Sequence, residues 1–164
     1  MPSYVINIAD APAFEHPVSG VRILFESPAA PFPHTGVNVQ VLRPGQPNCK
    51  YHSEGAQEDF LVLAGECRAL IDGEERTLRA WDFVHCEPGT PHVFVGDGDG
   101  PCWLLAIGAR REPEELHFPA DERAAQFGAS ARASTASGDE AYADWEGGPP
   151  PGDAPRVATP APPR

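Results

Sequence analysis

Apolar and polar residues alternate in short runs over the first two thirds of the chain, and this pattern predicts β-strands. The clearest run covers residues 36–42, where three valines alternate with Asn38 and Gln40. A period of two places the valines on one face of a strand and the two amides on the other. Shorter runs predict further strands at residues 4–8, 21–26, 49–52, 60–64, 67–71, 76–79, 83–86, 92–95 and 102–107. Many short strands with few helical signals predict an all-β fold, an antiparallel barrel or sandwich.

Turn residues separate these runs. Asp72 and Gly73 lie between two of them and form the strongest short-range signal for a β-hairpin. Pro44-Gly45 and Pro88-Gly89 end two other runs, and a loop rich in Gly and Asp occupies residues 96–101.

The last third of the chain lacks this alternation. Residues 120–128 predict a short helix, because Asp121 and Glu122 suit its first turn and Gly128 suits its end. The following residues are mainly Ala, Ser, Gly, Asp and Pro, which bury too little apolar surface to offset the entropy of ordering them. Two aromatic residues, Tyr142 and Trp145, are exceptions that could dock onto the barrel or a partner. We therefore predict a β-domain at 1–112, a short helical extension at 113–130 and a disordered Pro/Ala/Gly-rich acidic tail at 131–164.

The charge of the chain narrows the classes of partner. The formal net charge is −12 and the sequence pI is about 4.8. Such a surface repels phosphate backbones and anionic lipids, so we expect no nucleic-acid and no membrane partner. The N-terminus lacks the features of a signal peptide, and we expect a cytoplasmic protein. The four cysteines show no CxxC spacing and are expected to be reduced, half-buried thiols: Cys49, Cys67, Cys86 and Cys102.

Candidate chemistry lies between residues 52 and 92. In an extended strand His52 and Glu54 point to the same side, and Glu58 shares their parity unless Gly55 introduces a bulge. His92 follows a tight Pro-Gly turn and could join them from a neighbouring strand. Imidazole and carboxylate together suit Fe(II), Mn(II), Ni(II) or Zn(II), and a set of two His and one carboxylate leaves coordination positions open.

This spacing resembles the two motifs of the cupin superfamily, G(X)5HXH(X)3-4E(X)6G and G(X)5PXG(X)2H(X)3N, over residues 37–107. Glu58 and Gly65 fit the E(X)6G half, and Pro-Gly-Thr-Pro-His92 resembles the end of the second motif with its proline shifted by one. The resemblance implies a cupin-type jelly-roll β-barrel, a homodimer, and one divalent metal bound inside one end. The metal ligands it implies are His52, Glu58 and His92.

The sequence also departs from these motifs. The second histidine of the family falls on Glu54, the opening glycine of the second motif on Trp81 and its closing asparagine on Gly96, and one extra residue precedes His52. Glu54 is then a fourth ligand, a pocket base or a carboxylate that faces water at the pocket mouth. A second carboxylate would neutralise a divalent ion and favours Fe(II), Mn(II) or Zn(II).

Other residues near the motifs have two interpretations each. His85 is either a strand residue bonded to a backbone carbonyl or a group that moves a proton at the site. Asn38 and Gln40 form a solvated face or, if they point inward, bind substrate. Phe60 and Phe94 are core residues and also candidates for the pocket wall. His52 and His92 would be satisfied core histidines if the barrel holds no metal.

The first functional hypothesis is a metal-dependent enzyme acting on a small molecule, with Glu54 or His85 moving a proton. Dioxygenase-like oxidation is the first choice; isomerase, lyase and decarboxylase activities remain alternatives. The second hypothesis is a non-catalytic cupin that binds or senses a small ligand, and the third is a purely structural barrel. The predicted edge strand at residues 4–8 would need a partner, which adds to the expectation of a homodimer.

Overall fold

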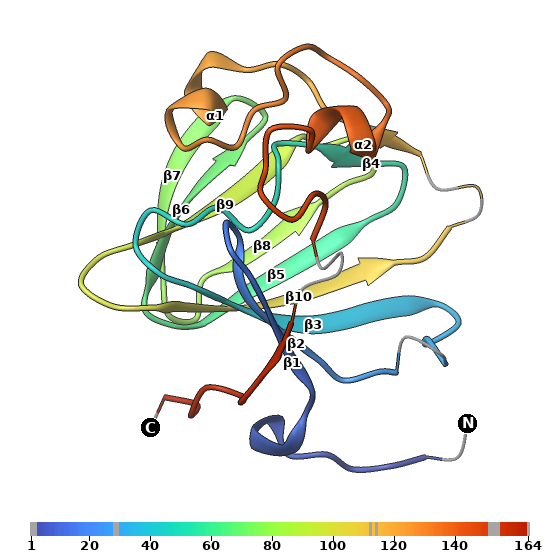
Figure 1. Ribbon diagram of the computed structural model, residues 1–164, viewed down its shortest axis with the longest axis vertical. Helices are drawn as coiled ribbons and strands as arrows, with labels where there is room; N and C mark the ends of the chain where they lie inside the picture. Colours follow the sequence, from blue (N-terminus) through green and yellow to red (C-terminus); the bar gives the residue numbers. More distant parts are fainter. Residues whose placement is uncertain (1–2, 28–29, 112, 114, 151–154, 164) are drawn as a thin grey trace.

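The computed structural model describes the chain except residues 1–2, 28–29, 112, 114, 151–154 and 164. Within the described residues, no helix has both the length and the apolar composition needed to cross a bilayer. The regular elements are, in chain order, η1 (Ile8–Asp10), β1 (Ala13–His16), β2 (Gly20–Leu24), β3 (Thr35–Leu42), β4 (Ser53–Glu54), β5 (Glu58–Ala64), β6 (Glu66–Ile71), β7 (Glu74–Arg79), β8 (Phe83–Cys86), β9 (His92–Asp97), β10 (Cys102–Ala109), β11 (Leu116–His117), α1 (Glu122–Gln126), α2 (Gly138–Ala141) and β12 (Arg156–Val157) (Figure 1).

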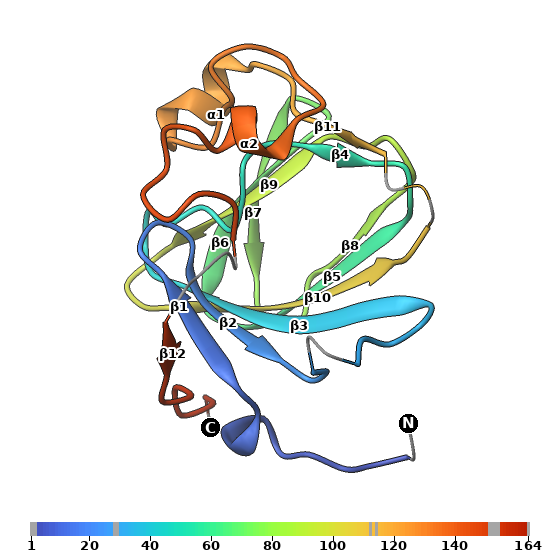
Figure 2. The ribbon, with the colours of Figure 1, turned by 45° about the vertical axis from the view of Figure 1, so that its right-hand side comes forward.

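Antiparallel pairing joins these strands into three sheets. The largest sheet has the order β12-β1-β2-β3-β10-β5-β8, a second has the order β7-β6-β9, and β4 pairs with β11. Figure 2 shows the two larger sheets as the walls of one barrel. The all-β prediction is confirmed, and the main core fills the space between the walls with side chains from both sheets: Leu42, Phe60, Val62, Cys67, Ala69, Leu78, Cys86, Phe94, Cys102, Leu104 and Ala106.

The predicted alternation along β3 is confirmed, and its two faces have different surroundings. Val39 and Val41 lie in a second apolar cluster together with Ile23 of β2. Asn38 and Gln40, on the opposite face, line a cavity inside the barrel. The polar face of this strand therefore points inward, toward the region that holds the candidate chemistry.

The predicted hairpin forms between β6 and β7. Ile71 pairs with Glu74, so Asp72 and Gly73 are the two residues of the turn. Their φ values are 50° and 74°, which is the left-handed conformation that both central residues of a type I′ turn require. The short range of this signal explains why the sequence alone located it.

The predicted strand at residues 4–8 is wrong. Residues 3–7 have no regular secondary structure, and η1 begins at Ile8. The side chain of Asn7 accepts a hydrogen bond from the backbone N of Ala9, which starts a helical turn where the alternation predicted extended chain. The edge-strand argument for a homodimer therefore no longer applies, and the homodimer stays a prediction.

The chain from residue 118 to residue 150 crosses one end of the barrel, and we call this segment the cap (Figures 1 and 2). Its helix α1 lies within the predicted span 120–128. Beyond residue 130 the structure differs from the expected disordered tail, because several cap side chains form one buried cluster: Phe118, Ala131, Ala141, Tyr142 and Trp145. Beyond residue 130, Tyr142 and Trp145 supply the apolar surface that the composition of this segment as a whole lacks. Residues 151–154 and 164 of the predicted tail lie outside the described residues.

Candidate metal centre

Two histidines face each other at the end of the barrel that the cap covers. The backbone N of His52 donates to His92 O (3.2 Å), and the backbone N of His92 donates to His52 O (2.8 Å). Residues that exchange both backbone hydrogen bonds lie directly opposite each other, so their side chains share one face. The two imidazole centroids are accordingly 5.0 Å apart, and both rings are buried.

Backbone carbonyls fix the orientation of both imidazoles. His52 Nδ1 donates to Lys50 O (2.9 Å), and His92 Nδ1 donates to Thr90 O (3.0 Å). A carbonyl oxygen only accepts, so the hydrogen of each neutral ring must sit on Nδ1. Each Nε2 then carries a lone pair, which is the arrangement found around metal-binding histidines.

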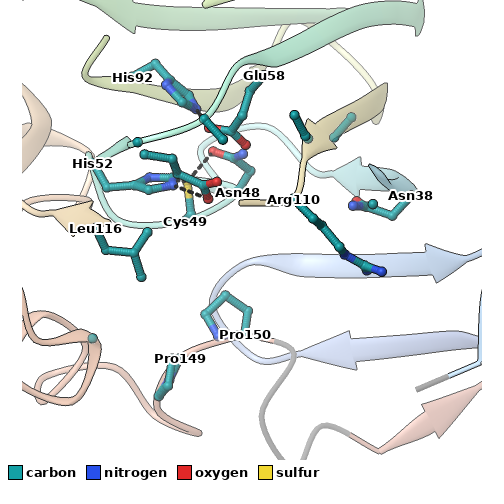
Figure 3. A pocket seen from close by; sticks show the side chains of 18 of the residues that line it. Asn38, Asn48, Cys49, His52, Glu58, His92, Arg110, Leu116, Pro149 and Pro150 are labelled. Carbon is teal, nitrogen blue, oxygen red and sulfur yellow. Dashed lines mark hydrogen bonds and ion pairs between the residues drawn. The ribbon is translucent and has the colours of Figure 1, made fainter. Parts of the chain in front are cut away.

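Glu58 completes a set of three ligand atoms. One atom each from His52, Glu58 and His92 lies within 4.8 Å of the other two, and Figure 3 shows the three side chains converging. Glu58 Oε2 and His92 Nε2 are 3.1 Å apart and buried, yet neither atom has a hydrogen bond of acceptable geometry among the described residues. Two buried polar atoms without partners are rare, and a shared cation would satisfy both. These residues therefore fit a divalent metal.

The electrostatics of the set also favour positive charge. Burial opposes protonation of His92, but the adjacent Cys86 and Glu58 side chains outweigh burial and raise its pKa to about 10. Burial likewise opposes protonation of His52, and the neighbouring Cys49, Glu54 and Glu58 raise its pKa. Burial alone would raise the pKa of Glu58, but His92 and His52 lower it. The site therefore attracts a cation, either a proton or a metal ion.

Glu54 lies beside the three ligand residues and outside their set. Its Oε1 is 3.4 Å from His52 Nε2, and its side chain is 23% exposed. It also lines the cavity, on β4 at the barrel mouth. Of the three roles predicted for Glu54, this position suits a pocket base between the ligand set and the substrate space.

A cavity of about 490 Å³ opens next to the ligand set. Asn38, Gln40 and Phe60 line it, and their predicted role in substrate binding stays a prediction. Figure 3 shows Asn38 across the cavity from the histidines, and Pro149 and Pro150 of the cap on another side. The cap therefore forms part of the cavity wall, and the ring of its residue Phe118 stacks on the His52 imidazole with ring centroids 5.6 Å apart.

Two predicted site residues lie away from the cavity. His85 is 41% exposed, and its ring contacts Asp59 (2.6 Å) and Glu87 (3.2 Å) on the outside of the barrel. Because Cys86 is buried, the alternation of β8 turns its neighbour His85 outward. The geometry therefore removes the basis for a proton-transfer role of His85. Phe94 is 0% exposed and packs behind His92 in the core, so it does not line the cavity.

Sequence reasoning missed the basic residues of the cavity. Arg22 on β2 lines it from within, and Arg110 and Arg111 line it near the mouth. A single arginine within the apolar run 21–24 was a signal that could have been used, because period two places Arg22 on the face opposite Val21 and Ile23.

Comparison with known proteins supports the fold. The family model for the cupin domain matches residues 38–108. A candidate sugar phosphate isomerase from Acidithiobacillus ferrooxidans is 24% identical, with a TM-score of 0.54, and the match covers 63% of this chain and 71% of that chain. A predicted oxalate decarboxylase from Thermotoga maritima is 19% identical, with a TM-score of 0.58 and coverage of 66% and 100%.

A third solved structure is a polyketide cyclase from Streptomyces resistomycificus, 15% identical, with a TM-score of 0.58 and coverage of 69% of this chain and 84% of that chain. No curated protein matches the chain. At these identities the structural matches establish the fold alone, and their different chemistries leave the reaction type to the site itself.

Proposed function

Because the chain belongs to the cupin superfamily, we propose that it is a mononuclear metal-dependent enzyme acting on a small molecule in the barrel cavity. We propose dioxygenase-like oxidation as the reaction. The observation that carries the proposal is the facing pair of buried, unpartnered atoms, Glu58 Oε2 and His92 Nε2, beside a second imidazole of fixed orientation.

Two histidines and one carboxylate form the ligand type of non-haem Fe(II) oxygenases, which keep open positions on the metal. His52, Glu58 and His92 would hold Fe(II), Mn(II) or Zn(II), and the ion would supply Lewis acidity and, as Fe(II), reactivity toward dioxygen. The proposal assigns one metal ion per chain.

The remaining groups prepare the site for chemistry. The carbonyls of Lys50 and Thr90 hold both imidazoles in one tautomer and one orientation. Glu54 Oε1, 3.4 Å from His52 Nε2, is placed to accept a proton from a substrate hydroxyl and to return it. Phe118 and Tyr142 of the cap line the cavity and exclude water from it.

Elemental analysis of untagged protein purified without chelator tests the metal site. We expect about one first-row metal ion per chain, and loss of that metal in His52→Ala and in His92→Ala, because each removes a ligand. His85→Ala is the matched control, since His85 lies outside the cavity, and should keep the metal. Loss of the metal in His85→Ala would contradict the ligand assignment.

Oxygen uptake tests the reaction. After loading with Fe(II), the protein is offered a panel of catechols, thiols, dicarbonyls and hydroxy acids. Uptake that depends on substrate and disappears in His92→Ala would support dioxygenase-like oxidation. A full complement of metal with binding but no turnover of any panel member would favour the alternative, a non-catalytic cupin that binds or senses a small ligand.

A further inference from the structure

We propose that the ligand of this cavity is a small hydroxycarboxylic acid whose carboxylate pairs with Arg22 while its hydroxyl donates to Gln40. This inference rests on the proposed function, because it assigns the substrate class of the same site. It follows from the positions of two side chains on neighbouring strands and from the charges around them.

Arg22 and Gln40 are direct neighbours on the inner wall of the barrel. The antiparallel pairing of β2 and β3 places Arg22 opposite Gln40, and Leu24 opposite Asn38. Residues directly opposite each other lie on the same face of a sheet, and both Arg22 and Gln40 line the cavity. The cavity wall that faces the ligand set thus presents a guanidinium beside an amide.

Arg22 differs from the other arginines of the cavity because its guanidinium has neither a counter-ion nor a hydrogen-bond partner among the described residues. Arg110, by contrast, pairs with Glu26 at 2.5 Å, and Arg111 donates to Gly55 O at 3.1 Å. Burial lowers the pKa of Arg22, whereas Cys49, Tyr142, Glu58 and Glu54 act in the opposite direction and favour its cationic form.

Arg22 is half-buried, and a guanidinium that faces a cavity without a partner is best satisfied by a carboxylate. The planar fork of arginine binds two carboxylate oxygens through parallel hydrogen bonds. Gln40 adds a second requirement. Its Nε2 donates to Asn38 Oδ1 (3.1 Å), while its Oε1 is buried and has no hydrogen-bond partner in the part of the chain that the structure describes. A substrate hydroxyl is the donor that would satisfy this oxygen.

The charges of the cavity favour a single carboxylate over a phosphate. Glu54 and Glu58 together balance the two charges of a divalent metal ion. Among the other charged residues of the lining, Arg110 is paired with Glu26, and Arg111 and Glu115 carry opposite charges. Arg22 then leaves one positive charge for the ligand, which a monocarboxylate neutralises. A phosphate dianion would leave an excess negative charge in a largely enclosed space, where such an excess is unfavourable. A cavity of about 490 Å³ is large enough for such a small acid.

Calorimetric titration of the full chain loaded with Zn(II), a redox-inert ion, tests the inference with four probes. Lactate carries both groups, lactamide lacks the charge, propionate lacks the hydroxyl, and glycerol 3-phosphate carries a phosphate instead. We expect lactate to bind more tightly than the other three. Arg22→Met should weaken lactate at least tenfold and leave lactamide unchanged, and Gln40→Leu should abolish the preference of lactate over propionate.

Two further variants keep the test decisive. Arg110→Met removes a cavity arginine that already has a counter-ion, and should leave lactate affinity unchanged. Arg22→Lys keeps the charge but loses the fork, and should give an intermediate affinity; it also serves if Arg22→Met fails to fold. Lactate affinity that is equal in wild type, Arg22→Met and Arg22→Lys would overturn the inference, as would Arg22-dependent binding of glycerol 3-phosphate that exceeds that of lactate.

The same titration distinguishes this inference from the proposed function. Zinc bound at one ion per chain, together with no Arg22-dependent binding of lactate, would overturn the carboxylate assignment and leave the metal proposal standing. Failure to hold zinc would overturn the metal proposal. In that case, Arg22-dependent binding of lactate to the metal-free chain would still support the carboxylate anchor, and its absence would overturn the anchor as well.

Discussion

Replacing Lys50 with methionine tests how the cap is held on the barrel. The Lys50 side chain is only 1% exposed, and its Nζ lies 2.8 Å from Asp144 Oδ1. It also donates to the backbone oxygens of Gly128 (3.2 Å) and Ser130 (2.9 Å). The Trp145 ring lies 5.1 Å from the ammonium group. Methionine keeps most of the side-chain volume and removes the charge, so the substitution isolates these polar contacts.

The size of the effect follows from what each partner loses. Removing one member of a buried ion pair costs about 3–5 kcal/mol. Asp144 is 29% exposed and can be rehydrated, which places the cost at the lower end. Gly128 O keeps a hydrogen bond from Trp145 Nε1 (2.9 Å), whereas Ser130 O loses its donor. We therefore expect Lys50→Met to lower the free energy of unfolding by about 3 kcal/mol.

Urea denaturation, followed by tryptophan fluorescence and near-UV circular dichroism, measures this change. Arg43→Met is the matched control, because Arg43 pairs with Glu15 at a similar distance, 2.9 Å, but their side chains are 69% and 36% exposed. Exposed pairs contribute less than about 1 kcal/mol, so the control should remain close to wild type. If Lys50→Met were as stable as the control, with Trp145 still buried, the cap would not depend on this ammonium group.

Two more predictions concern stability at low pH and Gly65, the closing glycine of the first motif. Burial alone would raise the pKa of Asp144, but the hydrogen bond and charge of Lys50 lower it below its ordinary value of 3.8. The stabilisation that ionised Asp144 contributes is therefore fully present above about pH 4 and is lost as the pH falls through its lowered pKa in the folded state. The free energy of unfolding of wild type, measured at decreasing pH, should show a drop in this range that is missing in Lys50→Met. Gly65 has φ 75°, and a Cβ there would meet Pro101 O at 2.4 Å. Gly65→Ala should cost clearly more in urea denaturation than Gly45→Ala, which has φ 83° but open space and should cost only about 1–2 kcal/mol; equal costs would contradict the steric argument.

The parts of the fold that were predicted correctly depend on neighbouring residues. The Asp72-Gly73 turn and the alternation along β3 are signals contained within a few positions of the chain. The cap was not predicted, because its contacts join residues far apart in the sequence. Lys50, for example, bonds Gly128 and Ser130, which lie 78 and 80 positions further along. Composition predicts whether a segment can form an extensive core, whereas the cap combines a small cluster of its own with contacts of Ala124 and Ala129 to the barrel.

The residues of the candidate site also fall into two groups, those that the sequence predicted and those whose position only the fold determines. His52, Glu58 and His92 were predicted together from motif spacing, and the structure brings their ligand atoms within 4.8 Å of one another. His85 lies in the same motif region but points outward. The burial of its neighbour Cys86 determines this orientation, and the motif spacing does not. Arg22 lies on a strand outside both motifs, and only the pairing of β2 with β3 places it in the cavity.

The cap and the candidate metal centre share a single short segment of the chain, and this connects closure with ligand orientation. Lys50 N donates to the Tyr142 hydroxyl (3.0 Å), and Lys50 O accepts from His52 Nδ1 (2.9 Å). Phe118 stacks on the same imidazole from the cap side. A cap that is displaced would therefore free the peptide whose carbonyl fixes the His52 tautomer. Because the fixed tautomer is what leaves Nε2 available as a ligand, the cap contacts at Lys50 and Phe118 link closure of the cavity to the orientation of His52.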